Sequence, residues 1–296
     1  MIGAVVVNFN AGPLLAESVR AALASTEPVE VVVVDNGSTD GSLAQLRSAT
    51  GGDPRVRILE MGANLGFARA SNAGLRELEG DHLLLLNPDC IVTPGALPAA
   101  RAALDASPGA GMAGGLLLNE DGTEQEGCRR SVPRPGRAFL RAFGISRLLR
   151  RVGRGGGDFV LSGQPLPTHP VEVDAVSGAF MMVKRGALER VGPLDEGYFL
   201  HCEDLDWCMR FRQAGLAVLF VPSAVAVHHK GTSSRARPVR VLWHMHRGML
   251  RYYGKFFRDE YPGPLMWLVA AGVALRFSAL ASLAAARNAR RRLLER

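Results

Sequence analysis

Hydrophobic and polar positions fall into blocks over the first hundred residues of the chain. Four short segments are almost wholly apolar: Ala4–Asn8, Val29–Val34, Val56–Leu59 and Leu83–Leu86. Strands of this kind are covered on both faces, as in a parallel sheet between helices. Apolar residues three and four apart predict intervening helices at Leu14–Ala24, Leu43–Ser48 and from Asn64 to about Leu78. The alternation predicts a parallel, doubly wound α/β sheet with helices on both faces.

The second half of the chain has a less regular pattern. Short apolar segments predict further strands at Met112–Leu118, Val171–Ala175, Ala179–Val183, Val218–Val221 and Ala224–Val227. Glu203–Ala214 predicts a helix that Gly215 stops. Two C-terminal helices are predicted: Val241–Phe257, rich in Arg, His and aromatic residues, and Leu265–Ala286, which is strongly apolar around Arg276.

Charge and cysteine content narrow the cellular setting. The formal charge is +7 over 296 residues, which suits a phosphate-bearing ligand, nucleic acid or an anionic membrane. Nine arginines and no acid lie between Cys128 and Gly157, and ten Lys/Arg and no acid lie between Trp207 and Arg258. Four cysteines without a CxxC pair favour reduced thiols and a cytosolic location. The opening MIGAVVVNFN resembles a first strand rather than a signal peptide.

Polar residues follow several of the predicted strands. Asp89 comes just after Pro88, which ends a strand, so it is expected at the carboxyl edge of the sheet, where ligands bind. Its carboxylate suits a divalent cation that also binds phosphate, or it accepts hydrogen bonds from turn amides. His228 also follows a strand and either ligates a metal or has a structural role.

Two loops of the first half are suited to a nucleotide. Asp35 opens DNGSTDGS, which either bonds a base or ribose or caps a turn. Asn64 and Gly66 open a helix whose free N–H groups can bind phosphate, and Arg69 adds charge nearby.

A cluster of acids begins the helix predicted at Glu203–Ala214. Glu203, Asp204 and Asp206 complement the helix dipole, and Asp206 can pair with Arg210. The apolar residues of the preceding FLHC also favour a raised carboxyl pKa and hence a general base. Trp207 offers either a flat face for a sugar ring or a side chain for the core.

Together these stretches resemble the family 2 (GT-A fold) glycosyltransferases, most closely a bacterial rhamnosyltransferase-like branch. The matching stretches, in order over about Val5–Ser234, are VVVNFN, VVVVDNGSTDGS, ANLGFARASNAG, LLLLNPDC, VSGAFMMVKR, LDEGYFLHCEDLDWCMRFRQAG and VAVHHKGTSS. The resemblance implies a GT-A, Rossmann-like mixed sheet, a nucleotide-diphospho-sugar donor (dTDP-, UDP- or GDP-linked), a divalent metal (Mg²⁺ or Mn²⁺) and inversion at the anomeric carbon. Rhamnose is the sugar that the branch suggests.

The resemblance also implies residue roles. Asp204 would be the catalytic base, assisted by Glu203. Asp89 and His228 would be the metal ligands, with Asn87 where the family's DxD motif has its first acid. The expected donor-binding residues are Asn8, Asn10, Asp35, Asn64, Gly66, Arg69, Asn72 and Asn87. The expected acceptor-binding residues are Gly178, Asp206 and Trp207.

The expected domains are a glycosyltransferase domain at 1–238 and a basic, apolar helical region at 239–296. The first divides into a nucleotide-binding half (1–100) and an acceptor and catalytic half (101–238) with a mobile basic loop near 128–157. Leu265–Ala286 is about long enough to span a bilayer. An interfacial or hairpin helix is preferred, ahead of a true span and a packed terminal helix. We therefore expect an enzyme at the inner face of the plasma membrane, on an anionic surface, extending a glycan or lipid-linked acceptor for cell-envelope polysaccharide.

Three rival hypotheses remain open from the sequence. A sugar nucleotidyltransferase would carry a Gly-rich, basic loop near its N-terminus. Asn8–Gly12, at that position, is not such a loop. A nucleic-acid-binding module would have aromatic-studded sheets or zinc motifs. Neither is visible in the sequence, so no nucleic acid is expected as a partner. A catalytically inactive glycan-binding protein is disfavoured by Asp89, Glu203 and Asp204.

Overall fold

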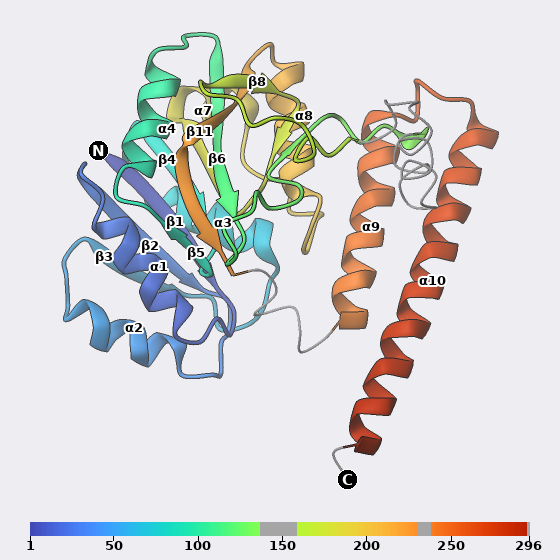
Figure 1. The fold of residues 1–296 in the computed structure, drawn as a ribbon, viewed down its shortest axis with the longest axis horizontal. Coiled ribbons are helices and arrows are strands. Elements are labelled where there is room, and N and C mark those ends of the chain that lie inside the picture. Colours follow the sequence, from blue (N-terminus) through green and yellow to red (C-terminus); the bar gives the residue numbers. More distant parts are fainter. Residues whose placement is uncertain (137–158, 230–237, 295–296) are drawn as a thin grey trace. The chain divides into compact units, whose positions relative to one another are not determined.

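The computed structural model of the chain describes residues 1–136, 159–229 and 238–294 (Figure 1). Contacts divide the chain into two compact units. The first comprises Met1–Val132, Val160–Phe199 and Glu203–Ser233, and the second comprises Pro133–Phe159, Leu200–Cys202 and Ser234–Arg296. The expected domain boundary at residue 238 stays a prediction.

The first unit begins with the predicted doubly wound sheet. Its parallel strands lie in the order β3-β2-β1-β4. They are β1 (Ile2–Asn8), β2 (Val29–Asp35), β3 (Val56–Glu60) and β4 (His82–Leu86), joined by helices α1 (Leu14–Leu23), α2 (Ser42–Thr50) and α3 (Phe67–Arg76). Strands β1 and β4 are buried at every position. Because crossovers are right-handed, α1 and α2 cover one face of the sheet and α3, where the strand order reverses, covers the other (Figure 1).

Beyond β4 the sheet becomes mixed. Strand β10 (Phe180–Lys184) runs antiparallel between β4 and β6 (Ala110–Leu118). Strand β11 (Ala217–His228) is parallel to β6, while β5 (Cys90–Val92) and β8 (Val171–Val173) pair with it antiparallel. The two strands predicted around Pro222 are one strand, whose register with β6 shifts between Val221 and Val225. Proline cannot donate to the ladder, so it is accommodated at an irregularity.

Several elements differ from the predicted helices and strands. They are α4 (Ala96–Asp105), α7 (Arg185–Val191) and the small sheet of β7 (Arg129–Arg130) with β9 (Ala175–Val176). Strand β7 corrects the expected mobile loop at 128–157, because Cys128 and Arg129 are buried parts of the fold. A buried ion pair to Glu124 and bonds to backbone carbonyls stabilise Arg129 there. Residues 137–158, which make up most of that expected loop, lie outside the described residues.

The strand register gathers the predicted polar residues at one edge of the sheet. Asn8 and Asp35 are direct partners at the ends of β1 and β2. His228 at the end of β11 pairs with Cys90, which follows Asp89. The start of β10 lies beside the end of β4 because Phe180 pairs with Leu86.

The second unit contains the two predicted C-terminal helices, α9 (Pro238–Phe256) and α10 (Gly263–Leu294). Trp243 and His246 of α9 pack against Phe277 of α10 with ring centroids 5.5 and 5.6 Å apart. Within α10, Gly263–Ala284 is long and apolar enough to cross a membrane, and only 6% of its most apolar stretch is buried. Trp267 on this helix is 80% exposed.

Candidate active site

The loops after β1 and β2 are bonded to one another. The Asn8 side-chain amide lies 2.8 Å from both Asp35 Oδ1 and Ser42 Oγ, and Asp35 Oδ2 accepts from the Ser38 amide at 3.1 Å. Asn10, in the left-handed region with φ 54°, donates its backbone amide to Ser38 Oγ at 3.0 Å. The predicted donor residues of these loops therefore form one preorganised cluster.

The loop that begins α3 is positioned by an asparagine that the sequence reading missed. Asn36 donates to Asn64 Oδ1 at 3.1 Å and accepts from the Leu65 amide at 2.9 Å. Gly66 has φ 93°, and a Cβ there would lie 2.7 Å from the carbonyl oxygen of Phe199. Only glycine allows this close approach of two backbones.

Arg69 and Asn72 on α3 bind the chain just before the acidic helix. Arg69 Nε pairs with Glu196 at 3.0 Å, and Asn72 exchanges two 2.9 Å hydrogen bonds with the backbone of Leu194. Asn72 is buried. Its carboxamide thus connects the nucleotide-binding half to the chain leading into the acids, and its donor contact stays a prediction.

The structure brings the two predicted metal ligands together. His228 Nε2 lies 3.2 Å from Asp89 Oδ1 and 3.3 Å from Asn87 Nδ2, and both His228 and Asp89 are buried. The neighbouring His229 instead faces Glu120 at 2.8 Å. His229 follows the last residue of β11, and its side chain faces Glu120 while His228 faces Asp89.

A carboxylate oxygen and an imidazole nitrogen at this spacing suit Mg²⁺ or Mn²⁺. No cluster of three or more His, Cys, Asp or Glu that could hold an ion occurs within the described segments. The pair therefore fits an ion whose coordination is completed by substrate phosphates and water, as is usual for Mg²⁺.

The predicted catalytic acids begin helix α8 (Glu203–Gln213). Asp204 Oδ2 lies 2.5 Å from Arg130 Nη2 and 3.4 Å from the backbone amide of Gly178. A Cβ on Gly178 would come within 3.3 Å of the Asp204 Cβ, so glycine leaves room for this acid. Arg130, hidden in the sequence among nine arginines, is the second site residue that the sequence reading missed.

Glu203 is buried beside Asp204, and its Oε2 has no hydrogen-bond partner among the described residues. Burial, followed by the charge of Asp204, raises the pKa of Glu203 well above its ordinary value. The two carboxyl groups therefore favour different protonation states. Burial favours the neutral form of Glu203, and the guanidinium of Arg130 favours the charged form of Asp204.

Two predicted acceptor residues are corrected by their burial. Asp206 and Trp207 are both 0% exposed, on the face of α8 that packs into the core. Asp206 accepts from Arg210 Nε at 2.7 Å. Trp207 donates to the Gly192 carbonyl at 3.0 Å and packs edge-on against Phe211. Trp207 therefore cannot stack on a sugar. The ion pair with Arg210 explains why a carboxylate is buried at Asp206.

The metal pair and the acid pair are linked through one short segment. Asn87 donates its backbone amide to the Ala179 carbonyl at 3.0 Å. Gly178, which precedes Ala179, contacts Asp204. All of these residues belong to the first unit. Residues 178–179 thus contact both Asn87, which lies beside His228, and Asp204.

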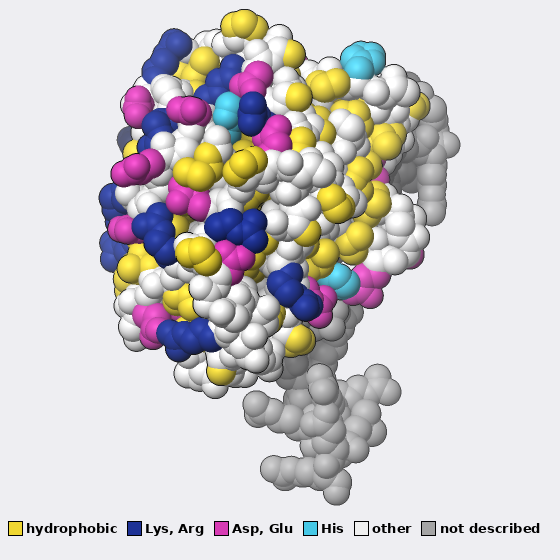
Figure 2. All heavy atoms as spheres, turned by 90° about the vertical axis from the view of Figure 1, so that its left-hand side faces the viewer, with side chains coloured by type: hydrophobic (Ala, Val, Ile, Leu, Met, Phe, Trp, Pro, Cys, Tyr) yellow, Lys and Arg dark blue, Asp and Glu magenta, His cyan; other side chains and the backbone are white. Residues whose placement is uncertain are grey.

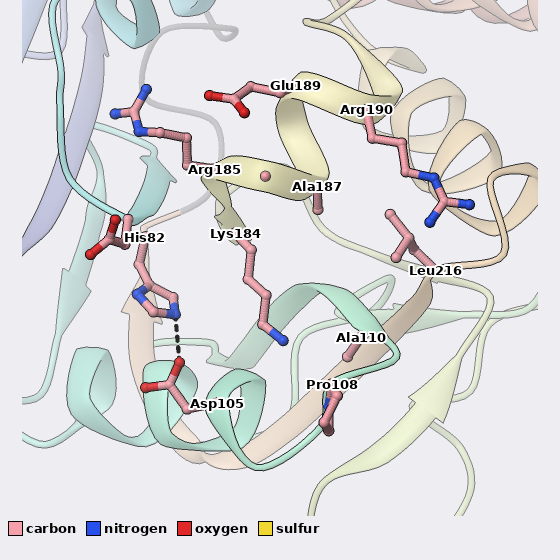
Figure 3. Close-up of a pocket in the computed structure, with 12 residues that line it drawn as sticks. His82, Asp105, Pro108, Ala110, Lys184, Arg185, Ala187, Glu189, Arg190 and Leu216 are labelled. Atoms are coloured by element: carbon pink, nitrogen blue, oxygen red, sulfur yellow. Dashed lines mark ion pairs between the residues drawn. The ribbon is translucent and has the colours of Figure 1, made fainter.

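A separate cavity of about 500 Å³ lies at the opposite edge of the sheet (Figure 3). It includes His82, where β4 begins, and Lys184, where β10 ends. His82 pairs with Asp105 at 2.9 Å, and Lys184 donates to the Ser107 carbonyl at 3.0 Å. The polar groups of His82 and Lys184 are thus bonded to other residues of the protein. The candidate active site therefore remains at the other end of β4 and β10.

The basic surplus is not visible on the face drawn in Figure 2, where Lys and Arg alternate with Asp and Glu. Local pairs such as Arg47–Glu60 and Arg55–Asp53 balance charge in the nucleotide-binding half. The net charge therefore does not by itself mark that half of the chain as a basic patch.

A mixed, doubly wound sheet with these two constellations at its carboxyl edge defines the GT-A class of glycosyltransferases. Two solved structures share the fold. Mannosyltransferase PcManGT from Pyrobaculum calidifontis, in complex with GDP-Man and Mn²⁺, matches 99% of this chain and 79% of its own at TM-score 0.59 and 19% identity. GalNAc-T7 with UDP, GalNAc and Mn²⁺ matches 77% of this chain and 43% of its own at TM-score 0.58 and 17% identity.

Sequence comparison assigns the family. The model of "Glycosyl transferase family 2" matches residues 4–153. The N-acetylglucosaminyl-diphospho-decaprenol L-rhamnosyltransferase of Mycobacterium tuberculosis is 31% identical over 98% of this chain and 95% of its own. Rhamnosyltransferase WbbL of Escherichia coli is 34% identical over 28% of this chain and 31% of its own. The chain belongs to glycosyl transferase family 2 and is a rhamnosyltransferase-like glycosyltransferase, which excludes the nucleotidyltransferase and non-catalytic hypotheses.

Proposed function

We propose that the protein transfers rhamnose, with inversion, from a nucleoside-diphosphate donor to a lipid-linked acceptor that ends in N-acetylglucosamine. The near full-length relative from Mycobacterium tuberculosis supports this acceptor class by its name. The observation that carries the chemistry is the link through residues 178–179 between the Asp89–His228 pair and Asp204. The product would serve cell-envelope polysaccharide synthesis.

On the donor side, Asn8 and Asp35 would bind the nucleoside, while Asp89 and His228 would hold a divalent ion beside the diphosphate. When bound, the ion supplies positive charge that stabilises the departing diphosphate. The loop hydrogen bonds keep the donor residues in place before the substrate arrives, so little reorganisation accompanies binding. Mn²⁺ accompanies the nucleotide or sugar nucleotide in both structural relatives, which supports this assignment.

On the acceptor side, Asp204 would take the proton of the acceptor hydroxyl as its oxygen bonds to the anomeric carbon. The bond from that carbon to the diphosphate breaks on the opposite face, and its electron pair leaves with the phosphate. Glu203, kept neutral by burial, leaves the negative charge on Asp204. Arg130 holds Asp204 in place until the acceptor binds.

The second unit supports a membrane-bound acceptor. Arg276 is the one charged residue of Gly263–Ala284, and its guanidinium lies 3.1 Å from His246 Nε2 on α9. This charge is thus directed at the neighbouring helix, while Trp267, Leu268 and Leu275 are exposed. Exposed apolar side chains of this size are typical of a helix that enters a membrane interface. We propose a cytoplasmic enzyme attached to the inner face of the plasma membrane.

The activity test uses the full chain in detergent with Mn²⁺ or Mg²⁺ and a panel of dTDP-, UDP- and GDP-sugars. The acceptor is a synthetic N-acetylglucosaminyl diphosphate on a short prenyl chain. Mass spectrometry should detect addition of one deoxyhexose, and NMR should show an inverted anomeric centre. Donor hydrolysis without transfer to any acceptor, or retention of configuration, would contradict the proposal.

Membrane attachment is tested by cell fractionation at low salt. The wild-type protein should sediment with membranes, and Trp267→Asp together with Leu268→Asp should shift it toward the soluble phase. Arg47→Asp, on the nucleotide-binding half, provides a control for changed charge. A wild-type protein found wholly in the soluble phase would refute the attachment.

A further inference from the structure

Gln125 lies behind the metal pair with a fixed orientation. It is 4% exposed, and its Oε1 lies 2.6 Å from His228 Nδ1. Its amide nitrogen donates to the His228 carbonyl and to Asn119 Oδ1, both at 3.2 Å. Two carbonyl-type acceptors thus take the NH₂ group, so the oxygen of the carboxamide must face the imidazole.

The backbone of Gln125 is equally well held. Its amide donates to the Leu117 carbonyl at 2.8 Å, and its carbonyl accepts from the Cys128 amide at 3.1 Å. Leu117 belongs to β6, the strand paired with β11, which ends at His228. Gln125 is therefore anchored to the same pair of strands that presents the histidine.

This contact decides which imidazole nitrogen carries the proton. A carboxamide oxygen can only accept, so Nδ1 must donate, and in the neutral ring the lone pair is then on Nε2. Asn87 Nδ2, 3.3 Å from Nε2, can donate to that lone pair, which agrees with the same tautomer. The available lone pair lies on the side of Asp89, 3.2 Å from its Oδ1.

We propose that Gln125 is a positioning residue for the metal: it fixes the tautomer and ring plane of His228 so that Nε2 and Asp89 bind one divalent ion. The inference rests on the metal assignment of the proposed function. Groups that bond to the non-ligating nitrogen of a metal-bound histidine change metal affinity by about 10- to 100-fold when removed.

The test measures Mn²⁺ affinity rather than turnover. Mn²⁺ is titrated into full-length protein with dTDP, UDP or GDP present in turn and followed by electron paramagnetic resonance. Gln125→Met keeps the length of the side chain but removes its polar atoms, and should weaken Mn²⁺ binding by about 10- to 100-fold. Gln125→Glu keeps an acceptor for Nδ1 but places an oxygen against the His228 carbonyl and Asn119 Oδ1, so it should lose less affinity than Gln125→Met. Pulsed measurements should show histidine nitrogen coupling to bound Mn²⁺ in the wild type and Gln125→Glu, and reduced coupling in Gln125→Met.

A double-mutant cycle with His228→Ala separates positioning from general damage. In the His228→Ala background, Gln125→Met should change Mn²⁺ affinity by less than about twofold. Equal weakening in both backgrounds, or wild-type affinity in Gln125→Met, overturns the inference. If Gln125→Met fails to fold, Gln125→Asn, which withdraws the oxygen by one methylene, must show the same loss of affinity, and its failure to do so also overturns it.

The wild-type arm reports separately on the proposed function. A wild-type protein that binds no Mn²⁺ with dTDP, UDP or GDP overturns the metal assignment and the role of Gln125 with it. Wild-type binding that depends on His228 but not on Gln125 overturns only the inference made here.

Discussion

Around Asp89 and His228 the polar atoms match one another, whereas at Glu203 one carboxyl oxygen is buried with no hydrogen-bond partner in the described part of the chain. On the first side, Gln125 and Asn87 supply an acceptor and a donor to the two nitrogens of one imidazole. On the second, the guanidinium of Arg130 stabilises the carboxylate of Asp204 beside the buried Glu203. The metal side is thus preorganised by hydrogen bonds, while the acid side depends on a balance of charge.

The comparison implies that the two sides can be disabled separately, and the largest effect is expected at the base. Asp204→Asn keeps the shape of the side chain but cannot take the proton from the hydroxyl of the acceptor substrate. The kcat should therefore fall by about 10²- to 10⁴-fold. Binding of dTDP with Mn²⁺, measured by calorimetry, should remain at the wild-type value. An active Asp204→Asn enzyme would remove Asp204 from the mechanism and leave the acid side without a function.

The complementary change on the metal side should spare the acids. Asp89→Ala removes a ligand, so Mn²⁺ should no longer stimulate donor binding, a loss of about 10-fold or more in donor affinity. Calorimetry with and without Mn²⁺ measures it directly. Ser71→Ala, a buried change on α3 away from this pair, serves as the control for packing. Unchanged Mn²⁺-dependent binding in Asp89→Ala would refute the ligand role.

The sequence identified the principal residues of both sides. Asn8, Asp35 and Asp89 follow apolar strands, and parallel strands bring their ends to one edge whatever the details of packing. His228 and Asp204 were likewise identified from motifs, and the structure places them beside Asp89 and Gly178.

The residues that sequence reasoning missed act through long-range contacts. Arg130 is one of nine arginines in its stretch, and nothing in the local sequence distinguishes it from the adjacent Arg129, which pairs with Glu124 instead. Gln125 lies in a polar turn with no periodicity, 103 residues from His228. Trp207 could have been assigned to the core, since it stands four residues from Glu203 and from Phe211 on the buried face of one helix.

Replacing the cation of the acid side should have an intermediate effect. Arg130→Met leaves two adjacent carboxyl groups without their guanidinium, which should cost about 1.5–3 kcal/mol of stability. The charged form of Asp204 loses support, so the acidic limb of the pH–rate profile should move to higher pH. Arg134→Met, which removes an arginine of an exposed pair with Glu260, is the matched control. A profile identical to that of the control would show that Arg130 does not hold the base.

The smallest expected effect concerns the pH dependence of stability at Glu203. Burial, with the charge of Asp204 added, raises the pKa of this carboxyl in the folded state, so the folded protein holds a proton that the unfolded chain releases. Its contribution is therefore present at low pH and is lost as pH rises toward the raised pKa. Glu203→Gln cannot ionise, so its stability relative to wild type should increase by about 1 kcal/mol or more between about pH 5 and pH 8. Urea unfolding of both proteins across that range measures the difference, and a constant difference would mean that Glu203 is charged in the folded state and that the two carboxyl groups are not separated as inferred.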